Sequence, residues 1–176
     1  MMTQSRFFLT SSAWLARMLA VFAFAMSLWG LAAASADHRI LLMVTNHETG
    51  QVTGLTDPEL AALPQVAFQT GTMWTEDVET FEGPTLRSVL RAAGLDPDKP
   101  VLASAENDYT IVIDPALTDE KAPIIAMRRN GEAFDLRQKG PLWVVYPFDS
   151  SDAFNTEQHF SISIWQLVAI ESLPEE

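Results

Sequence analysis

The sequence predicts a β-rich α+β domain. Short runs of apolar and β-branched residues follow one another from residue 39 to residue 170, and turn-forming residues separate them. Only two brief helical patterns interrupt these runs. The chain shows no regular alternation of strands and helices, which marks βαβ units, and no glycine-rich phosphate loop. We therefore expect a sheet-rich fold with few helices.

Residues 1–36 have the pattern of a secretory leader. Two arginines are the only charged residues before Asp37, an apolar run covers residues 18–33, and three small residues end at Ala36. The alternative is an uncleaved membrane anchor, because the run approaches the length that spans a bilayer. No cysteine follows the run and no twin-arginine pair precedes it. We expect cleavage after Ala36, export as an unfolded chain, and a single periplasmic domain over 37–176.

The first part of that domain carries clear helix signals. Strand patterns cover 39–45 and 65–70. Between them, residues 56–59 (TDPE) fit a capping box with proline in the first turn, and the short helix ends before Pro64. Residues 84–93 predict a second helix with one apolar face.

Turn residues organise the rest of the chain. Gly94 ends the second helix, and strands are expected at 101–105 and 109–114 around the turn Glu106-Asn107-Asp108. A strand over 123–128 leads into Asn130-Gly131, a strong hairpin signal. Residues 142–146 are apolar on both faces, so this strand is expected in the centre of its sheet, and 162–170 closes the domain.

Composition excludes several kinds of chemistry. The chain has no cysteine, which rules out disulfides, zinc–thiolate sites and thiol nucleophiles. Its three histidines have no metal-ligand spacing, and no serine nucleophile motif is present, so we predict no catalytic residue and no metal site. The net charge of −12 opposes binding to nucleic acid or anionic lipid. It indicates a basic partner, a ligand with cationic character, or simple solubility.

One tryptophan stands out from the others. Trp74 follows the strand 65–70 and lies among small polar residues, in the stretch VAFQTGTMWTE. It therefore belongs to a loop, where binding residues concentrate. Trp143 and Trp165 lie in apolar strand patterns, and we expect both in the core.

A flat heterocycle suits the polar residues near such a loop. Arg128 ends a strand and is either a surface residue or a fork for ligand oxygens, while Tyr109 offers an aromatic hydroxyl. Tyr146 and Asp149 border a long polar loop, Ser150 to Gln158. Stacking on Trp74 with a few hydrogen bonds predicts micromolar binding.

The ordered set FEGPTLRSVLRAAGL, ENDYTIVI, IIAMRRNGEAF, KGPLWVVYPFD and SIWQLVAIE resembles the molybdopterin-binding domain of the sulfite oxidase fold. The resemblance runs from about residue 40 to residue 170 and implies a mixed sheet. It is closest to small, stand-alone exported members. Enzymes of this fold bind molybdenum through a loop cysteine, which here would fall near Thr70 or Gly71. This chain has no cysteine, so thiolate ligation of molybdenum is impossible.

The resemblance implies a periplasmic, non-catalytic protein that binds a pterin without molybdenum. Some such relatives signal to a membrane enzyme that makes or degrades cyclic di-GMP. Two alternatives stay open: a molybdopterin-dependent oxidoreductase-like domain that keeps a redox function, and a protein-interaction module whose pocket has closed. In this comparison Trp74 stacks on the pterin, and the pocket also includes Thr70, Thr72, Asn107, Tyr109, Arg128, Tyr146 and Asp149.

Overall fold

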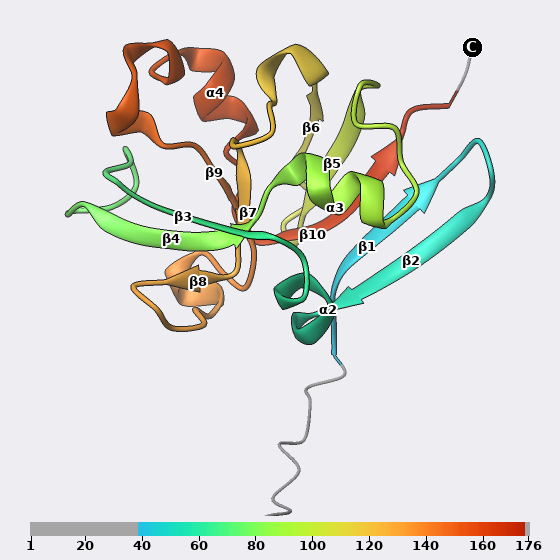
Figure 1. Cartoon of the computed structure of the whole chain (residues 1–176), viewed down its shortest axis with the longest axis horizontal. Coiled ribbons are helices and arrows are strands. Elements are labelled where there is room, and N and C mark those ends of the chain that lie inside the picture. Colours follow the sequence, from blue (N-terminus) through green and yellow to red (C-terminus); the bar gives the residue numbers. More distant parts are fainter. Residues whose placement is uncertain (1–38, 175–176) are drawn as a thin grey trace, which may run out of the picture. The chain divides into compact units, whose positions relative to one another are not determined.

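The computed structural model describes residues 39–174, so the predicted leader lies outside the described residues. The largest sheet has five strands, in which β1 and β10 pair in parallel while the other neighbouring strands are antiparallel. The sheet is thus mixed, as expected (Figure 1). Its order is β2 (Gln51–Thr56), β1 (Ile40–Asn46), β10 (Leu167–Ser172), β5 (Val101–Ala105) and β6 (Thr110–Ile113).

Two smaller sheets complete the β-structure. One joins β3 (Gln65–Thr70), β4 (Glu79–Pro84) and β8 (Arg128–Arg129), and the other pairs β7 (Ile124–Ala126) with β9 (Trp143–Val145). Strand β4 passes very close to β7: a Cβ atom on Gly83 would lie 2.0 Å from the carbonyl oxygen of Ile125. Glycine at this position lets the two strands cross.

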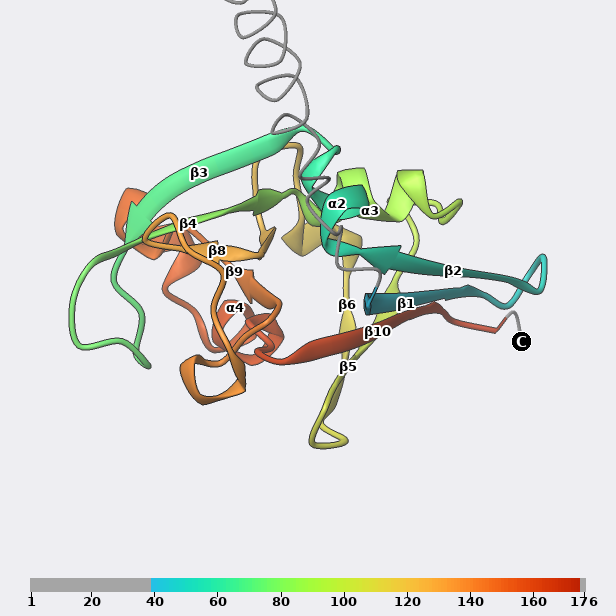
Figure 2. The same ribbon diagram turned by 90° about the horizontal axis from the view of Figure 1, so that it is seen from below.

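Helices α2 and α3 are short, and their ends carry the local signals that the sequence predicts. Helix α2 (Asp57–Ala61) starts with the expected box, in which the Glu59 carboxylate accepts from the Thr56 N–H at 2.8 Å. Helix α3 (Leu86–Ala92) is terminated by Gly94, which follows the C-cap residue Ala93 and has φ +80°. There the Leu95 N–H donates to the Leu90 carbonyl, a Schellman motif. Figure 2 shows both helices on one side of the large sheet.

Several elements differ from the expectation. Strands β2 and β4 were not predicted. Helix α4 (Glu157–Ile162) begins within the predicted polar loop 150–158 and ends at the start of the predicted closing strand 162–170. The closing strand, β10, begins only at Leu167. The Asn130-Gly131 turn is confirmed by two positive φ angles, 53° and 83°. Its return arm is a single bridge to Glu132 rather than a strand. The described part of the chain also contains four 3₁₀ turns: η1 (Pro115–Leu117), η2 (Leu136–Gln138), η3 (Phe148–Ser150) and η4 (Asp152–Phe154).

The core has two parts. The larger lies between the five-stranded sheet, α3 and β9, and includes the fully buried Tyr146. The smaller is aromatic, with Phe81 and Trp143 at its centre, and Trp74 and Trp165 pack against it while staying partly exposed. Trp143 is thus in the core, as predicted, and Trp165 is at its edge. No helix over residues 39–174 is long and apolar enough to cross a membrane.

Candidate functional site

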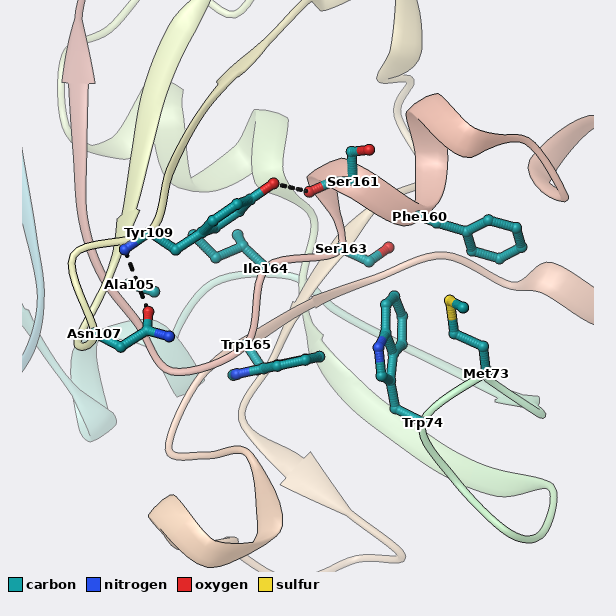
Figure 3. A pocket seen from close by; sticks show the side chains of 10 residues that line it. All are labelled: Met73, Trp74, Ala105, Asn107, Tyr109, Phe160, Ser161, Ser163, Ile164 and Trp165. Atoms are coloured by element: carbon teal, nitrogen blue, oxygen red, sulfur yellow. Dashed lines mark hydrogen bonds between the residues drawn. The ribbon is translucent and has the colours of Figure 1, made fainter.

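A pocket of about 380 Å³ opens beside the aromatic core. It lies between the loop after β3, the β5–β6 turn and the segment that leaves α4 (Figure 3). This volume lies within the range of small-molecule sites. Its lining is mostly apolar and consists of Met73, Trp74, Ala105, Asn107, Tyr109, Phe160, Ser161, Ser163, Ile164 and Trp165.

Local hydrogen bonds turn the Trp74 ring inward. The hydroxyl of Thr72 accepts from the backbone N–H of Trp74 at 3.1 Å, and the Thr75 hydroxyl accepts from the backbone N–H of Thr72 at 3.0 Å. This tight threonine turn exposes the Met73 side chain, which keeps 67% of its surface accessible. The small polar residues around Trp74 therefore form a turn that presents the indole to the pocket.

The same loop is attached to the chain after β9. Asp149 accepts a 2.6 Å hydrogen bond from the Gly71 N–H, and its own N–H donates to the Thr70 hydroxyl at 3.1 Å. Thr70 is fully buried. Of the predicted site residues, Thr70, Thr72 and Asp149 thus hold the Trp74 loop and do not line the aromatic pocket. Thr72 and Asp149 border a neighbouring cavity that shares Met73 and Phe160 with it.

Two indole rings meet at a right angle in the pocket. The ring centroids of Trp74 and Trp165 are 5.4 Å apart, with an interplanar angle of 82°. Trp74 also makes edge contacts with Trp143 and Phe160 at 5.9 and 6.4 Å. Such T-shaped pairs are favourable and hold each ring in place. The Lys139 ammonium lies 4.5 Å from the Trp165 centroid and braces that ring.

The third wall comes from the β5–β6 turn. The Tyr109 hydroxyl donates to the Ser161 carbonyl at 3.2 Å, and this bond ties the turn to the end of α4. The side-chain amide oxygen of Asn107 accepts from the backbone N–H of Tyr109 at 3.3 Å. Figure 3 shows Tyr109, Trp165 and Trp74 around one space. The predicted residues Trp74, Asn107 and Tyr109 therefore come together.

Arg128 lies at a different site. Its guanidinium binds both carboxylate oxygens of Asp57 at 2.7 and 2.8 Å, and it lines a separate cavity of about 790 Å³. The hydrogen bond to Arg128 lowers the pKa of Asp57. The prediction that Arg128 shares a pocket with Trp74 is therefore wrong. The register of β8 directs the Arg128 side chain toward α2.

Tyr146 also lies elsewhere than expected. Its side chain has 0% exposure, and its hydroxyl donates to the Leu117 carbonyl at 2.6 Å. Burial raises the pKa of this phenol. Tyr146 is therefore a core residue that fixes η1, and it does not form a wall of any described pocket.

Sequence reasoning missed Trp165 and Phe160. Trp165 was expected in the core because it stands in an apolar run. No local pattern placed Trp165 at the pocket, because Ser161 belongs to helix α4 rather than to a strand, and the consecutive residues Ser163 and Ile164 both line the pocket.

The residue set does not fit the molybdenum cofactor of the resembling enzymes. The chain has no cysteine to supply a thiolate, and residues 39–174 contain no cluster of three or more metal-ligating side chains. The lining of the aromatic pocket includes no arginine or lysine to pair with the phosphate of molybdopterin.

No family model and no curated protein matches the chain. The crystal structure of the sulfane dehydrogenase SoxCD from Paracoccus pantotrophus is similar to it, with a TM-score of 0.57 and 16% identity. The match covers 76% of this chain and 38% of that one, so this chain spans well under half of that structure. At this identity the likeness concerns the fold alone, a mixed, sheet-rich α+β arrangement.

Proposed function

We propose that this protein is a periplasmic, non-catalytic pterin-binding protein. The observation that carries the proposal is the pocket between Trp74 and Trp165, in which two perpendicular indoles and a tyrosine surround a space of about 380 Å³. Flat, uncharged rings are the ligands that such walls favour. A pterin is a planar bicycle that carries both hydrogen-bond donors and acceptors, and this volume accommodates it.

The energetics support binding in the micromolar range. Contact between a ligand ring and an aromatic side chain contributes about 1 kcal/mol beyond the burial of area. Each neutral hydrogen bond adds about 1 kcal/mol net. Two ring contacts, a few hydrogen bonds and the buried area of a bicycle together reach about 8 kcal/mol, which corresponds to micromolar affinity.

The protein acts as a sensor module in this proposal. Its partner is the periplasmic domain of a membrane enzyme that synthesises or degrades cyclic di-GMP. The leader pattern, the family resemblance and the net charge of −12, which suits a basic docking face, support this role. The Trp74 loop joins the pocket to the surface through the exposed Met73, so a bound ligand contacts a segment that a partner can also touch.

A fluorescence titration tests the binding proposal. The chain from Asp37 onward is titrated with a pterin, and quenching of the pterin emission reports the dissociation constant. Trp74→Ala is expected to weaken binding at least tenfold, about 1.4 kcal/mol. Val52→Ala removes an exposed apolar side chain on β2 and is the matched control. Equal affinities of Trp74→Ala and the unsubstituted chain would defeat the proposal.

The likeness to a dehydrogenase favours one second candidate, a molybdopterin oxidoreductase-like domain with a redox role. Molybdenum at one atom per chain, in protein purified from its native host, would establish that candidate over the first. The other alternative, an interaction module with a closed pocket, is opposed by the open cavity beside Trp74.

A further inference from the structure

The pocket beside Trp74 has no charged lining. Each of its ten lining residues is apolar or neutral and polar. Near these residues in sequence, Glu106 and Asp108 flank Asn107, and Glu76 and Asp77 follow the Trp74 turn, while the Lys139 ammonium lies over the Trp165 ring and is not part of the lining. A ligand that carries a negative group therefore finds no charged partner among the lining residues, in a chain whose net charge is −12.

The hydroxyl protons in the pocket are already used. Tyr109 donates to the Ser161 carbonyl, Ser161 donates to the Glu157 carbonyl at 2.8 Å, and Ser163 donates to the His159 carbonyl at 2.8 Å. Each hydroxyl oxygen keeps its lone pairs. Toward a ligand, these three groups can therefore act as acceptors.

Three N–H groups remain as donors. Over residues 39–174, the ring nitrogens of Trp74 and Trp165 and the amide nitrogen of Asn107 donate to no protein acceptor, and none of them is a buried unsatisfied atom. In Figure 3 the Trp165 nitrogen points toward Asn107, and the Trp74 nitrogen lies on the side of its ring that faces Trp165. The free donors of the site thus lie at the two ends of the Trp165 ring, with the Trp74 nitrogen at one end and the Trp165 and Asn107 nitrogens at the other.

We propose that this pocket selects an uncharged, phosphate-free heterocycle and rejects the phosphorylated form of the same ring. The inference rests on the proposed pterin function and narrows its ligand class. Ring nitrogens and a carbonyl of the ligand accept from the three N–H groups, while its amino group donates to the hydroxyl oxygens. Trp165 lines the pocket, and the Lys139 ammonium lies 4.5 Å from its ring centroid. We expect Trp165 to contribute as much to the binding affinity as Trp74.

The decisive experiment compares neopterin with neopterin monophosphate at low ionic strength. Neopterin is expected to bind at least tenfold more tightly, and added salt is expected to narrow the difference, because repulsion between exposed charges is screened. Equal or tighter binding of the monophosphate overturns the inference. Failure of both compounds to bind overturns the proposed function itself.

Two substitutions test Trp165. Trp165→Ala is expected to weaken neopterin binding at least tenfold, and Trp165→Phe, which keeps a ring but loses the N–H, about threefold to fivefold. Circular dichroism shows whether each variant is folded. If Trp165→Ala does not fold, the Trp165→Phe variant alone decides the test. Unchanged affinity in a folded variant removes Trp165 from the site.

Discussion

The carboxylate of Asp149 accepts a 2.6 Å hydrogen bond from the backbone N–H of Gly71, although 78 positions separate the two residues. The return bond from the Asp149 N–H to Thr70 makes this a two-point attachment. It fixes the start of the turn that carries Trp74. We therefore expect Asp149 to contribute to the affinity for a pterin, although it does not line the aromatic pocket.

Asp149→Ala is expected to weaken pterin binding about threefold to tenfold, because Trp74 then samples more orientations before binding. Asp149→Asn keeps an acceptor for Gly71 and is expected to retain most of the affinity. Fluorescence titration measures both. Asp152→Ala removes a carboxylate from the same segment without touching the loop and should behave as the unsubstituted chain. Equal effects at 149 and 152 would show that charge alone matters.

The ion pair between Arg128 and Asp57 joins β8 to the start of α2 and should stabilise the fold. Both side chains are about 30% exposed, so Arg128→Ala is expected to lower the free energy of unfolding by about 1 kcal/mol at pH 7. Chemical denaturation measures the change. The double variant with Asp57→Ala should lose less than the sum of the single variants. Strict additivity would show that the pair is energetically neutral.

The same pair predicts a pH dependence. Because the hydrogen bond to Arg128 lowers the pKa of Asp57 below 3.8, the stabilisation is complete above that pH. It is lost as the pH falls through the lowered pKa of the folded state. The stability difference between the unsubstituted chain and Arg128→Ala should therefore shrink on acidification. A difference that stays constant down to acid unfolding contradicts this account.

His159 should make stability fall at mildly acidic pH. Its ring packs edge-on against Tyr146 at 4.8 Å and Phe154 at 5.5 Å, and burial lowers its pKa below 6.5. The unfolded chain then binds this proton more readily, so stability declines as the pH drops from 6.5 toward the lowered pKa of the folded state. His159→Phe keeps the ring contacts and should remove this dependence of stability on pH. Thermal melting at a series of pH values measures the effect. Identical slopes would exclude His159 as the cause.

Two glycines give a matched test of close packing. Gly83→Ala places a methyl group 2.0 Å from the Ile125 oxygen, and the strands β4 and β7 must separate. We expect a loss of about 3 kcal/mol or more. Gly131→Ala meets no atom within 4 Å but has φ +83°, so it should cost about 1 kcal/mol. Similar costs at the two positions would refute the close crossing.

The sequence predicted the elements that depend on neighbouring residues. The Thr56–Glu59 box, the Gly94 helix end and the Asn130-Gly131 turn are each determined within a few positions, and all three are confirmed. The loop position of Trp74 is also confirmed. It was predictable because the small polar residues on both sides of Trp74 disfavour a strand. Signals of this range are readable from one chain.

Features set by distant partners could not be predicted. The register of β8 sends Arg128 to Asp57, and the enclosure of Tyr146 depends on the carbonyl of Leu117, 29 positions earlier. Trp165 reaches the pocket because the segment after α4 bends before β10 and Gln166 takes φ +53°. Such placement follows from tertiary packing, which local patterns do not contain.

The parallel pairing of β1 with β10 has a consequence for assembly. The first strand of the domain bonds to the last, and β10 lies in the interior of its sheet, with β1 on one side and β5 on the other. The hairpins β1–β2 and β5–β6 can each close early, but no strand of this sheet pairs with both until the final strand arrives. A chain that is cut short before Leu167 should therefore lose the pairing that joins the two hairpins into one sheet.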